Sequence, residues 1–256
     1  MIGKRILKFC IWHLVFFLCV LTPLLAFARV EDTKHNLSVS GPGDVRAVSE
    51  TQICIFCHTP HNASPAQPLW NHELSAVVNY VNYASPTLQS YSSEAEAPPI
   101  DGYSKLCLSC HDGTVAIGSI VSRWDEIIMV TVPGVIDASG KLIGGPGYLG
   151  TDLSGGHPIL GTALSGGHPI SIIFDEALWI KRNSAYPPLT RLKWPIIDPD
   201  VKLRPTQGGY GVQCTACHDP HGNKATEGWP PFWQKATHDE VCMVCHEAIP
   251  PGDIEW

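Results

Sequence analysis

The chain has 256 residues, with 10 Cys and 12 His but only 16% charged residues. A hydrophobic fraction of 44% excludes a wholly disordered chain, and a net charge of −7 argues against a nucleic-acid-binding protein, whose surface would be basic. The length allows one or two domains with a sizeable core. The excess of Cys and His is therefore the feature that the spacing along the chain must explain.

The first 28 residues have the pattern of a secretory signal peptide. Three basic side chains over residues 4–8 precede an apolar run over residues 9–21, and residues 26–28 read Ala-Phe-Ala, a small-residue cleavage site. We therefore expect residues 1–28 to be removed and residues 29–256 to form one domain, exported to the periplasm or the cell surface. The alternative is an uncleaved membrane anchor. After cleavage, the protein is not expected to be integral to a membrane.

All eight cysteines beyond residue 28 belong to four C-x-x-C-H motifs. The motifs are Cys54-Ile-Phe-Cys57-His58, Cys107-Leu-Ser-Cys110-His111, Cys214-Thr-Ala-Cys217-His218 and Cys242-Met-Val-Cys245-His246. This is the attachment signature of c-type haem. Two thiols at this spacing reach the two vinyl groups on one porphyrin edge, and the imidazole that follows binds the iron. Zinc sites, redox dithiols and disulfides are the alternatives, but none of them requires His after every second Cys.

The sequence thus predicts four covalently attached haem c groups with iron. The eight motif cysteines bind the cofactor, and His58, His111, His218 and His246 are the proximal iron ligands. Each iron has a second axial position, and only Met129 and Met243 could supply a thioether beyond residue 28. Met243 lies between two attachment cysteines and cannot reach over its own ring. We therefore expect histidine at the second position of at least most haems.

Two distal candidates occupy the same place in a repeated pattern. His61 and His221 both end a C-x-x-C-H-x-P-H sequence. Residues three apart lie on one side of a helical turn, so neither can reach the far face of the haem that its own motif holds. Each is expected to bind a neighbouring haem. We pair His61 with the haem at residues 107–110 and His221 with the haem at residues 242–245.

Further histidines compete for the remaining distal positions. Residues 150–160 and 161–171 are near-identical tandem copies, each containing Ser-Gly-Gly-His-Pro-Ile. One copy supplies a ligand, and we favour His168 over His157. His35 lies in a polar N-terminal arm that can reach a haem of the same chain or of a neighbouring one. His72 and His238 stay open as ligands or as ordinary surface or core residues.

Regular structure is expected to be sparse, because 22 Pro and 23 Gly interrupt helices and strands alike. The predicted elements are helical turns at the four motifs, short helices over residues 75–79 and 171–181, and a strand over residues 127–132. Attachment sites begin at residues 54, 107, 214 and 242, so few residues serve each haem. The predicted fold class is a multihaem cytochrome c: mostly irregular coil, with short helices and few short strands, wrapped around a haem array.

The motifs resemble the doubled-CxxCH-motif multihaem cytochromes c. The resemblance rests on the two C-x-x-C-H-x-P-H sequences, on Leu106–Thr114 and on the His-Pro-Ile segment at His168. Similar tetrahaem chains include outer-surface cytochromes of metal-reducing bacteria, some of which form extracellular filaments. The resemblance implies bis-histidine, low-spin haems and electron transfer, and it implies the following distal iron ligands: His61, His221, His168 and His35.

The expected function is electron transfer through closely spaced haems, without catalysis on a substrate, so no catalytic residue is assigned. Redox partner proteins or extracellular electron acceptors are the expected partners, with a homopolymer as a further option and no nucleic acid. Removal of residues 1–28 leaves a net charge of about −10, which suits basic partners. The alternative is a multihaem reductase that acts on a small oxyanion at one open haem iron.

Overall fold

The computed structural model describes residues 29–64, 69–83, 85, 87–149, 168–185, 190–222 and 232–247. The predicted signal peptide and His157 lie outside these residues. Within the described part of the chain, no helix combines the length and the apolar character needed to cross a membrane.

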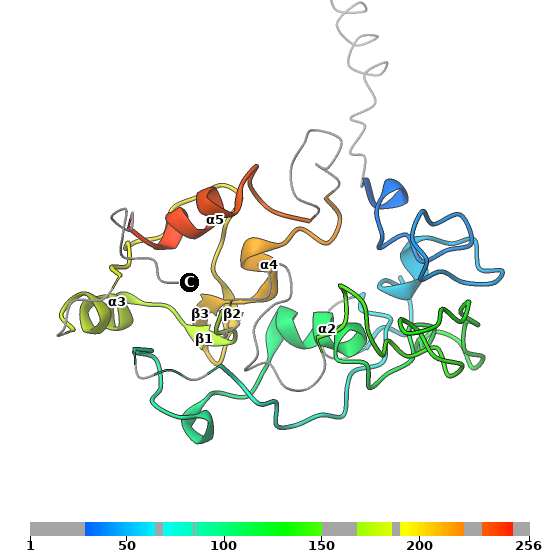
Figure 1. Ribbon diagram of the computed structural model, residues 1–256, viewed down its shortest axis with the longest axis horizontal. Helices are drawn as coiled ribbons and strands as arrows, with labels where there is room; N and C mark the ends of the chain where they lie inside the picture. Colours follow the sequence, from blue (N-terminus) through cyan, green and yellow to red (C-terminus); the bar gives the residue numbers. More distant parts are fainter. Residues whose placement is uncertain are drawn as a thin grey trace, which may run out of the picture.

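Short elements separated by long irregular segments make up the described chain, in agreement with the predicted fold class (Figure 1). Three are single 3₁₀ turns: η1 (Arg29–Asp32), η2 (Cys54–Phe56) and η3 (Glu94–Glu96). The helices are α2 (Gly102–His111), α3 (Glu176–Asn183), α4 (Cys214–Cys217) and α5 (His238–Cys245). The strands are β1 (Ile172–Ile173), β2 (Arg204–Thr206) and β3 (Gly209–Val212).

The strands form a small antiparallel sheet in the order β1-β3-β2. Strands β2 and β3 form a hairpin in which Thr206 is paired with Gly209 across a two-residue turn. Both turn residues, Gln207 and Gly208, have positive φ angles, 45° and 84°. A two-residue turn of this kind matches the right-handed twist of the strands. The hairpin leads directly into α4, so it positions the third C-x-x-C-H motif.

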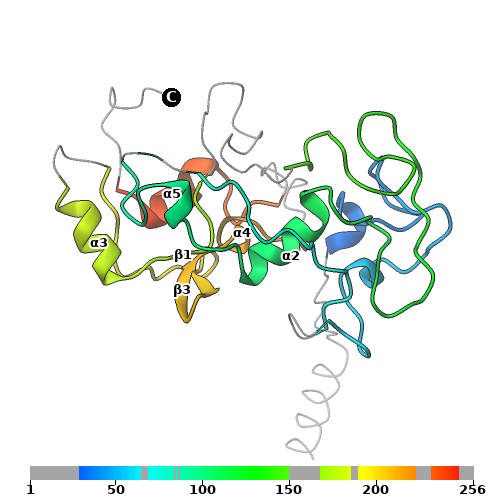
Figure 2. The same ribbon diagram turned by 90° about the horizontal axis from the view of Figure 1, so that it is seen from below.

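The four motifs follow one another along the long axis of the molecule. In Figures 1 and 2, η2 lies at one side among the blue and cyan segments, α2 and α4 lie in the middle, and α5 lies at the other side. The N-terminal segment and residues 112–149 surround η2, whereas the sheet and α3 lie beside α5. The order in space is therefore the order in the sequence.

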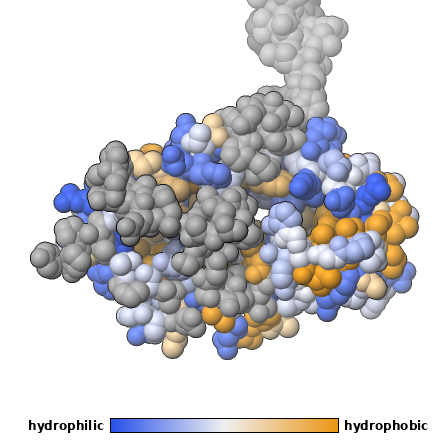
Figure 3. All heavy atoms as spheres, viewed as in Figure 1, coloured by the Kyte–Doolittle hydropathy of each residue, from blue (hydrophilic) through white to orange (hydrophobic). Residues whose placement is uncertain are grey.

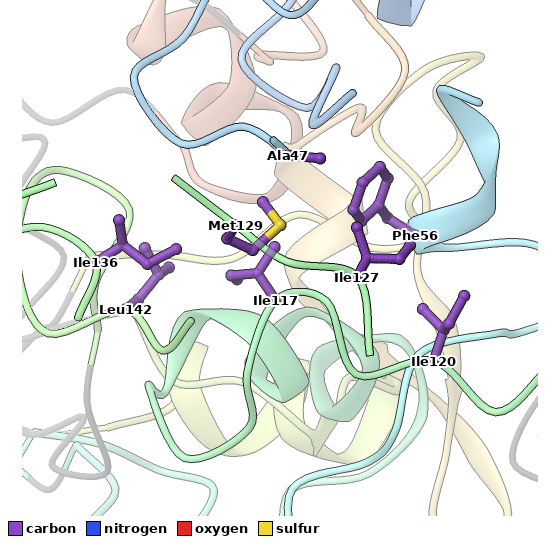
Figure 4. Packing of buried hydrophobic residues seen from close by; sticks show 8 residues of the cluster. All are labelled: Ala47, Phe56, Ile117, Ile120, Ile127, Met129, Ile136 and Leu142. Carbon is purple, nitrogen blue, oxygen red and sulfur yellow. The ribbon is translucent and has the colours of Figure 1, made fainter. Parts of the chain in front are cut away.

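Small apolar clusters stand in place of one large core. The cluster in Figure 4 joins Phe56 of η2 to Ile117, Ile127 and other side chains of residues 112–149, and Cys57 and Cys110 pack at its edge. A second cluster, which includes Ile172 and Val212, packs against Cys245. Apolar side chains also reach the surface of the part around η2 (Figure 3), where Trp124 is completely exposed. The attachment cysteines thus border the apolar interior.

A buried polar network fixes α2 against α4. Gln213, which has no exposed surface, accepts a hydrogen bond from the backbone N–H of Ser104 and donates to Asp101 Oδ1. The Ser104 hydroxyl in turn accepts from the backbone N–H of Cys214. Asp101 also accepts hydrogen bonds from Thr206 Oγ1 and the backbone N–H of Gln207 in the hairpin. The start of one C-x-x-C-H helix is thereby tied to the start of the next.

Three predicted elements differ from those observed. Residues 75–79 form neither helix nor strand. Ser75 Oγ accepts from the N–H of Val77 and Lys105 Nζ donates to the Val77 carbonyl, so these bonds take the place of helical ones. Residues 127–132 form only isolated bridges, since their partners are short loops such as the one that contains Ala47. Within residues 171–181, the Ile-Ile pair joins the sheet as β1. Helix α3 begins only after Asp175, whose carboxylate caps it.

Replacing Gln213 tests the network. Gln213→Leu leaves the N–H of Ser104 buried without an acceptor, and an unmade buried hydrogen bond costs about 1–3 kcal/mol. We expect the free energy of unfolding of the haem-loaded protein, measured by circular dichroism in denaturant, to fall by about 3 kcal/mol. The matched control is Gln52→Leu, because Gln52 is exposed. Equal stability of the two variants would contradict the role of the network.

Candidate functional site

Each C-x-x-C-H motif forms a helical turn, as predicted. In three motifs the N–H of the histidine donates to the carbonyl of the first cysteine, at 2.8 Å for His58, 3.0 Å for His218 and 2.9 Å for His246. His111 is the last residue of α2. After it, Gly113 has a φ of 74°, and a Cβ there would lie 2.3 Å from the Leu142 carbonyl oxygen, so only glycine fits. A turn of this kind presents both thiols of a motif on one side, as attachment to one porphyrin requires.

In three motifs, the backbone of the proximal histidine is paired with another segment of the chain through an antiparallel bridge. His58 is paired with Trp70, His218 with Trp233 and His246 with Leu192. In each case the residue after the bridging residue donates its N–H to the carbonyl of the second motif cysteine. These donors are Asn71, Gln234 and Lys193, at 3.0, 3.0 and 2.8 Å. The N–H of the residue after each histidine donates to the carbonyl of the residue before the bridging residue, which completes the pair of bonds. We call this arrangement the histidine clamp.

Three proximal histidines each face a second histidine. The ring centroids are 5.8 Å apart for His58 and His221, 6.0 Å for His111 and His35, and 6.3 Å for His246 and His168. An imidazole nitrogen binds a transition metal at about 2 Å, and its ring centre lies about 1 Å further away. Two imidazoles on opposite sides of one metal therefore have centroids about 6 Å apart. The spacing of all three pairs fits a single iron between the rings.

Hydrogen bonds orient several of these rings for metal binding. Nδ1 of His35 contacts the Pro220 carbonyl at 3.0 Å, and Nδ1 of His168 contacts the Pro169 carbonyl at 2.8 Å. Nδ1 of His111 contacts the Gly147 carbonyl in the same way. A carbonyl can only accept, so Nδ1 carries the proton and Nε2 of the neutral ring is left to bind a metal.

The charge state of two of these histidines also suits an axial ligand, which must be neutral. Burial lowers the pKa of His35 to about 4, helped by His111, and burial lowers the pKa of His246 to about 4, helped by His168. Both rings are therefore uncharged at neutral pH.

Three of the motif thiols do not have the lowered pKa of a redox dithiol, although the pKa of Cys214 is lowered by the neighbouring Cys107. All eight described cysteines are free. Burial raises the pKa of Cys57, Cys110 and Cys217 to about 12, whereas redox-active C-x-x-C pairs have lowered pKa values. Among the residues that the structure describes, no group of three or more His, Cys, Asp or Glu side chains converges on one point as a metal ion would require.

Unsatisfied buried donors add to the fit with a cofactor. Trp70 Nε1 and Thr215 Oγ1 are buried without a hydrogen-bond partner among the described residues, and both belong to haem-motif segments. Haem propionates are acceptors of the kind that these groups lack. The thiols, paired imidazoles and orphan donors together fit covalently attached haem.

The pairing of His221 differs from the sequence-based hypothesis. The sequence pairs His221 with the fourth motif, but in the structure His221 lies opposite His58 of the first motif. The ring opposite His246 of the fourth motif is that of His168. The reason is that the N-terminal segment packs on the third motif, where the His35 ring also stacks on Phe232 with centroids 4.3 Å apart. Sequence spacing carries no information on that long-range contact.

The remaining histidines have different surroundings. His61 is exposed, and its carbonyl accepts from Thr59 Oγ1. His72 is completely buried, with both ring nitrogens directed at backbone carbonyls, those of Glu73 and Ala116. It is a structural residue of the interior. His238, at the start of α5, packs edge-on against Trp233, with centroids 4.5 Å apart.

The histidine clamp was missed at the level of sequence, although a signal for it exists. Each C-x-x-C-H-x-P-H sequence is followed by a second short repeat, Pro-Leu-Trp-Asn at residues 68–71 and Pro-Phe-Trp-Gln at residues 231–234. The residue before each Trp has a positive φ, 66° at Leu69 and 64° at Phe232. The repeat therefore has a common backbone shape as well as a common sequence.

Comparison with protein families agrees with this site. Residues 205–250 match the family described as Doubled CXXCH motif. The matched segment covers β2, β3, α4 and α5, and thus the third and fourth attachment motifs. None of the curated proteins compared with the chain matches it. The family match supports a multihaem c-type cytochrome with covalently bound haem and an electron-transfer role.

Removing His221 tests the pairing. His221→Ala is expected to open one iron, so that the ferrous protein binds about one carbon monoxide per chain and one low-spin haem becomes high-spin. Added imidazole should restore the low-spin spectrum. In a Cys54→Ala/Cys57→Ala background, which lacks the first haem, His221→Ala should open no iron. Carbon monoxide binding in that background would show that His221 serves another haem.

Proposed function

We propose that residues 29–256 form one exported tetrahaem cytochrome c unit that carries electrons in the periplasm or at the cell surface. Covalent haem supplies the one-electron redox chemistry, and the chain supplies attachment, axial ligands and spacing. The observation that carries the proposal is the set of three histidine pairs, each with a proximal histidine of a C-x-x-C-H motif and each at the spacing for one iron.

The sequence pairs His61 with the second motif, but His35 lies opposite His111 there, so His61 is instead our proposed distal ligand for the motif of His218. It occupies the same place in its C-x-x-C-H-x-P-H sequence as His221 does in the other copy. Because His221 lies opposite His58, a reciprocal exchange between the two copies would pair His61 with His218. All four motifs would then have two histidines, as low-potential electron carriers do.

The attachment cysteines support a relay in sequence order. Cys57 lies close enough to Cys110 for the two thiols to influence each other's charge. The thiols of Cys107 and Cys214 are close enough for each to shift the pKa of the other, upward for Cys107 and downward for Cys214. Cys217 is likewise close to Cys245. The first cysteines of the outer motifs, Cys54 and Cys242, are exposed. The inner motifs therefore connect two outer ones, at which electrons enter and leave.

Redox proteins or extracellular acceptors are the proposed partners, and the acidic chain favours basic ones. A homopolymer joined by His35 has less support, because His35 lies opposite His111 of its own chain and the arm is bonded there. Ala47 donates to the Leu37 carbonyl, and Val130 donates to the Arg46 carbonyl.

Redox and ligand-binding measurements test the proposed function. The mature protein should carry four haems by mass, titrate with four low potentials, and show only low-spin spectra with no carbon monoxide binding. It should pass electrons to a soluble acceptor without turning over nitrite or sulfite. A high-spin haem that binds carbon monoxide, together with turnover of either oxyanion, would replace this proposal with a reductase.

A further inference from the structure

The three histidine clamps share a backbone but differ in the side chain opposite the proximal histidine. It is Trp70 at His58, Trp233 at His218 and Leu192 at His246. The same pair of hydrogen bonds forms in each. The three clamps therefore have the same backbone hydrogen bonds, but two of them carry a tryptophan and one a leucine opposite the histidine.

The indole of Trp70 meets the ring of His58 edge-on, with centroids 6.4 Å apart and an interplanar angle of 89°. The ring of His58 also lies nearly parallel to the ring of His221, at 24°. At the clamp with Leu192, by contrast, the rings of His246 and His168 are crossed at 76°. His111, which has no such bridge among the described residues, is at 63° to His35. Of these three pairs, the nearly parallel one is the pair whose proximal ring meets an indole edge-on. The His218 ring also contacts an indole, that of Trp233, but the two rings are tilted at 52°.

We propose that Trp70 is a positioning residue that sets the plane of the His58 imidazole. A flat, rigid indole against one edge of the ring restricts its rotation about the bond to Cβ, whereas a leucine offers the ring no flat surface of this kind. The clamp holds Trp70 in register, because Asn71 donates to the Cys57 carbonyl and Thr59 to the Leu69 carbonyl. The proposal rests on the proposed function in that it requires a haem at the first motif.

Ring orientation has an electronic consequence for a low-spin ferric iron. Two parallel imidazoles act on the same iron dπ orbital and separate it in energy from the other. Two crossed imidazoles act on one orbital each and leave the pair nearly equal. The electron paramagnetic resonance spectrum is moderately anisotropic in the first case and extremely anisotropic in the second. The first haem should therefore give a signal of the parallel type, and the haems of His111 and His246 signals of the crossed type.

Trp70→Leu places at His58 the side chain that the clamp already carries at His246, so the backbone bridge should survive. We expect mass spectrometry to show four attached haems. We also expect the parallel-type signal to lose intensity equivalent to about one haem, with a matching gain of crossed-type signal. Trp70→Phe keeps an aromatic edge and should retain the wild-type spectrum. Trp124→Leu is the matched control, because Trp124 is completely exposed and should change nothing.

The outcomes separate this proposal from the proposed function. A Trp70→Leu protein with four haems and an unchanged spectrum would overturn the role of Trp70 while leaving the cytochrome intact. A wild-type protein without covalent haem would remove the proposed function itself. If Trp70→Leu fails to load four haems, Trp70→Met, whose flexible side chain fills irregular space, is measured with the same two outcomes.

Discussion

The hydrogen-bonded contact between α2 and α4 is the constraint on which the arrangement of the motifs depends. Gln213 and Asp101 join the start of α2, the hairpin and the start of α4, and they lie in the interior, where unmade hydrogen bonds are costly. The contact brings the thiols of Cys107 and Cys214 together. With the inner motifs fixed in this way, the outer motifs occupy opposite sides of the molecule (Figure 1).

The histidine clamp solves a problem that follows from scarce regular structure. A histidine at the end of a single helical turn is weakly restrained, because the last carbonyls and the next residue have no helical partners. A bridge from a distant segment satisfies those groups and fixes the backbone of the ligand at the same time. Reuse of the bridge at three motifs shows that the position of the histidine depends on pairing with another segment as well as on the motif.

The chemistry of this chain could be predicted from sequence more completely than its contacts. C-x-x-C-H motifs are local, so their helical turns followed from spacing. The partner of His221 did not, because it depends on how the N-terminal segment packs near the third motif. The sheet was missed for a related reason. Strand β1 has only two residues, and what defines it is its pairing with β3 forty residues later. The Pro-Leu-Trp-Asn and Pro-Phe-Trp-Gln repeats were present in the sequence, but their meaning appears only with the bridges.

The N-terminal arm shows how a chain with small apolar clusters can still fix its ligands. Asn36 donates to the Glu31 carbonyl and accepts from Ser38, so the arm is folded by its own polar side chains before it reaches the site. His35 then contacts the Pro220 carbonyl, within the second C-x-x-C-H-x-P-H copy, and lies opposite His111. His35 thus joins the second and third motifs directly. Because His221, next to Pro220, faces His58, the His35–His111 and His58–His221 pairs are linked through two adjacent residues of the third motif's segment.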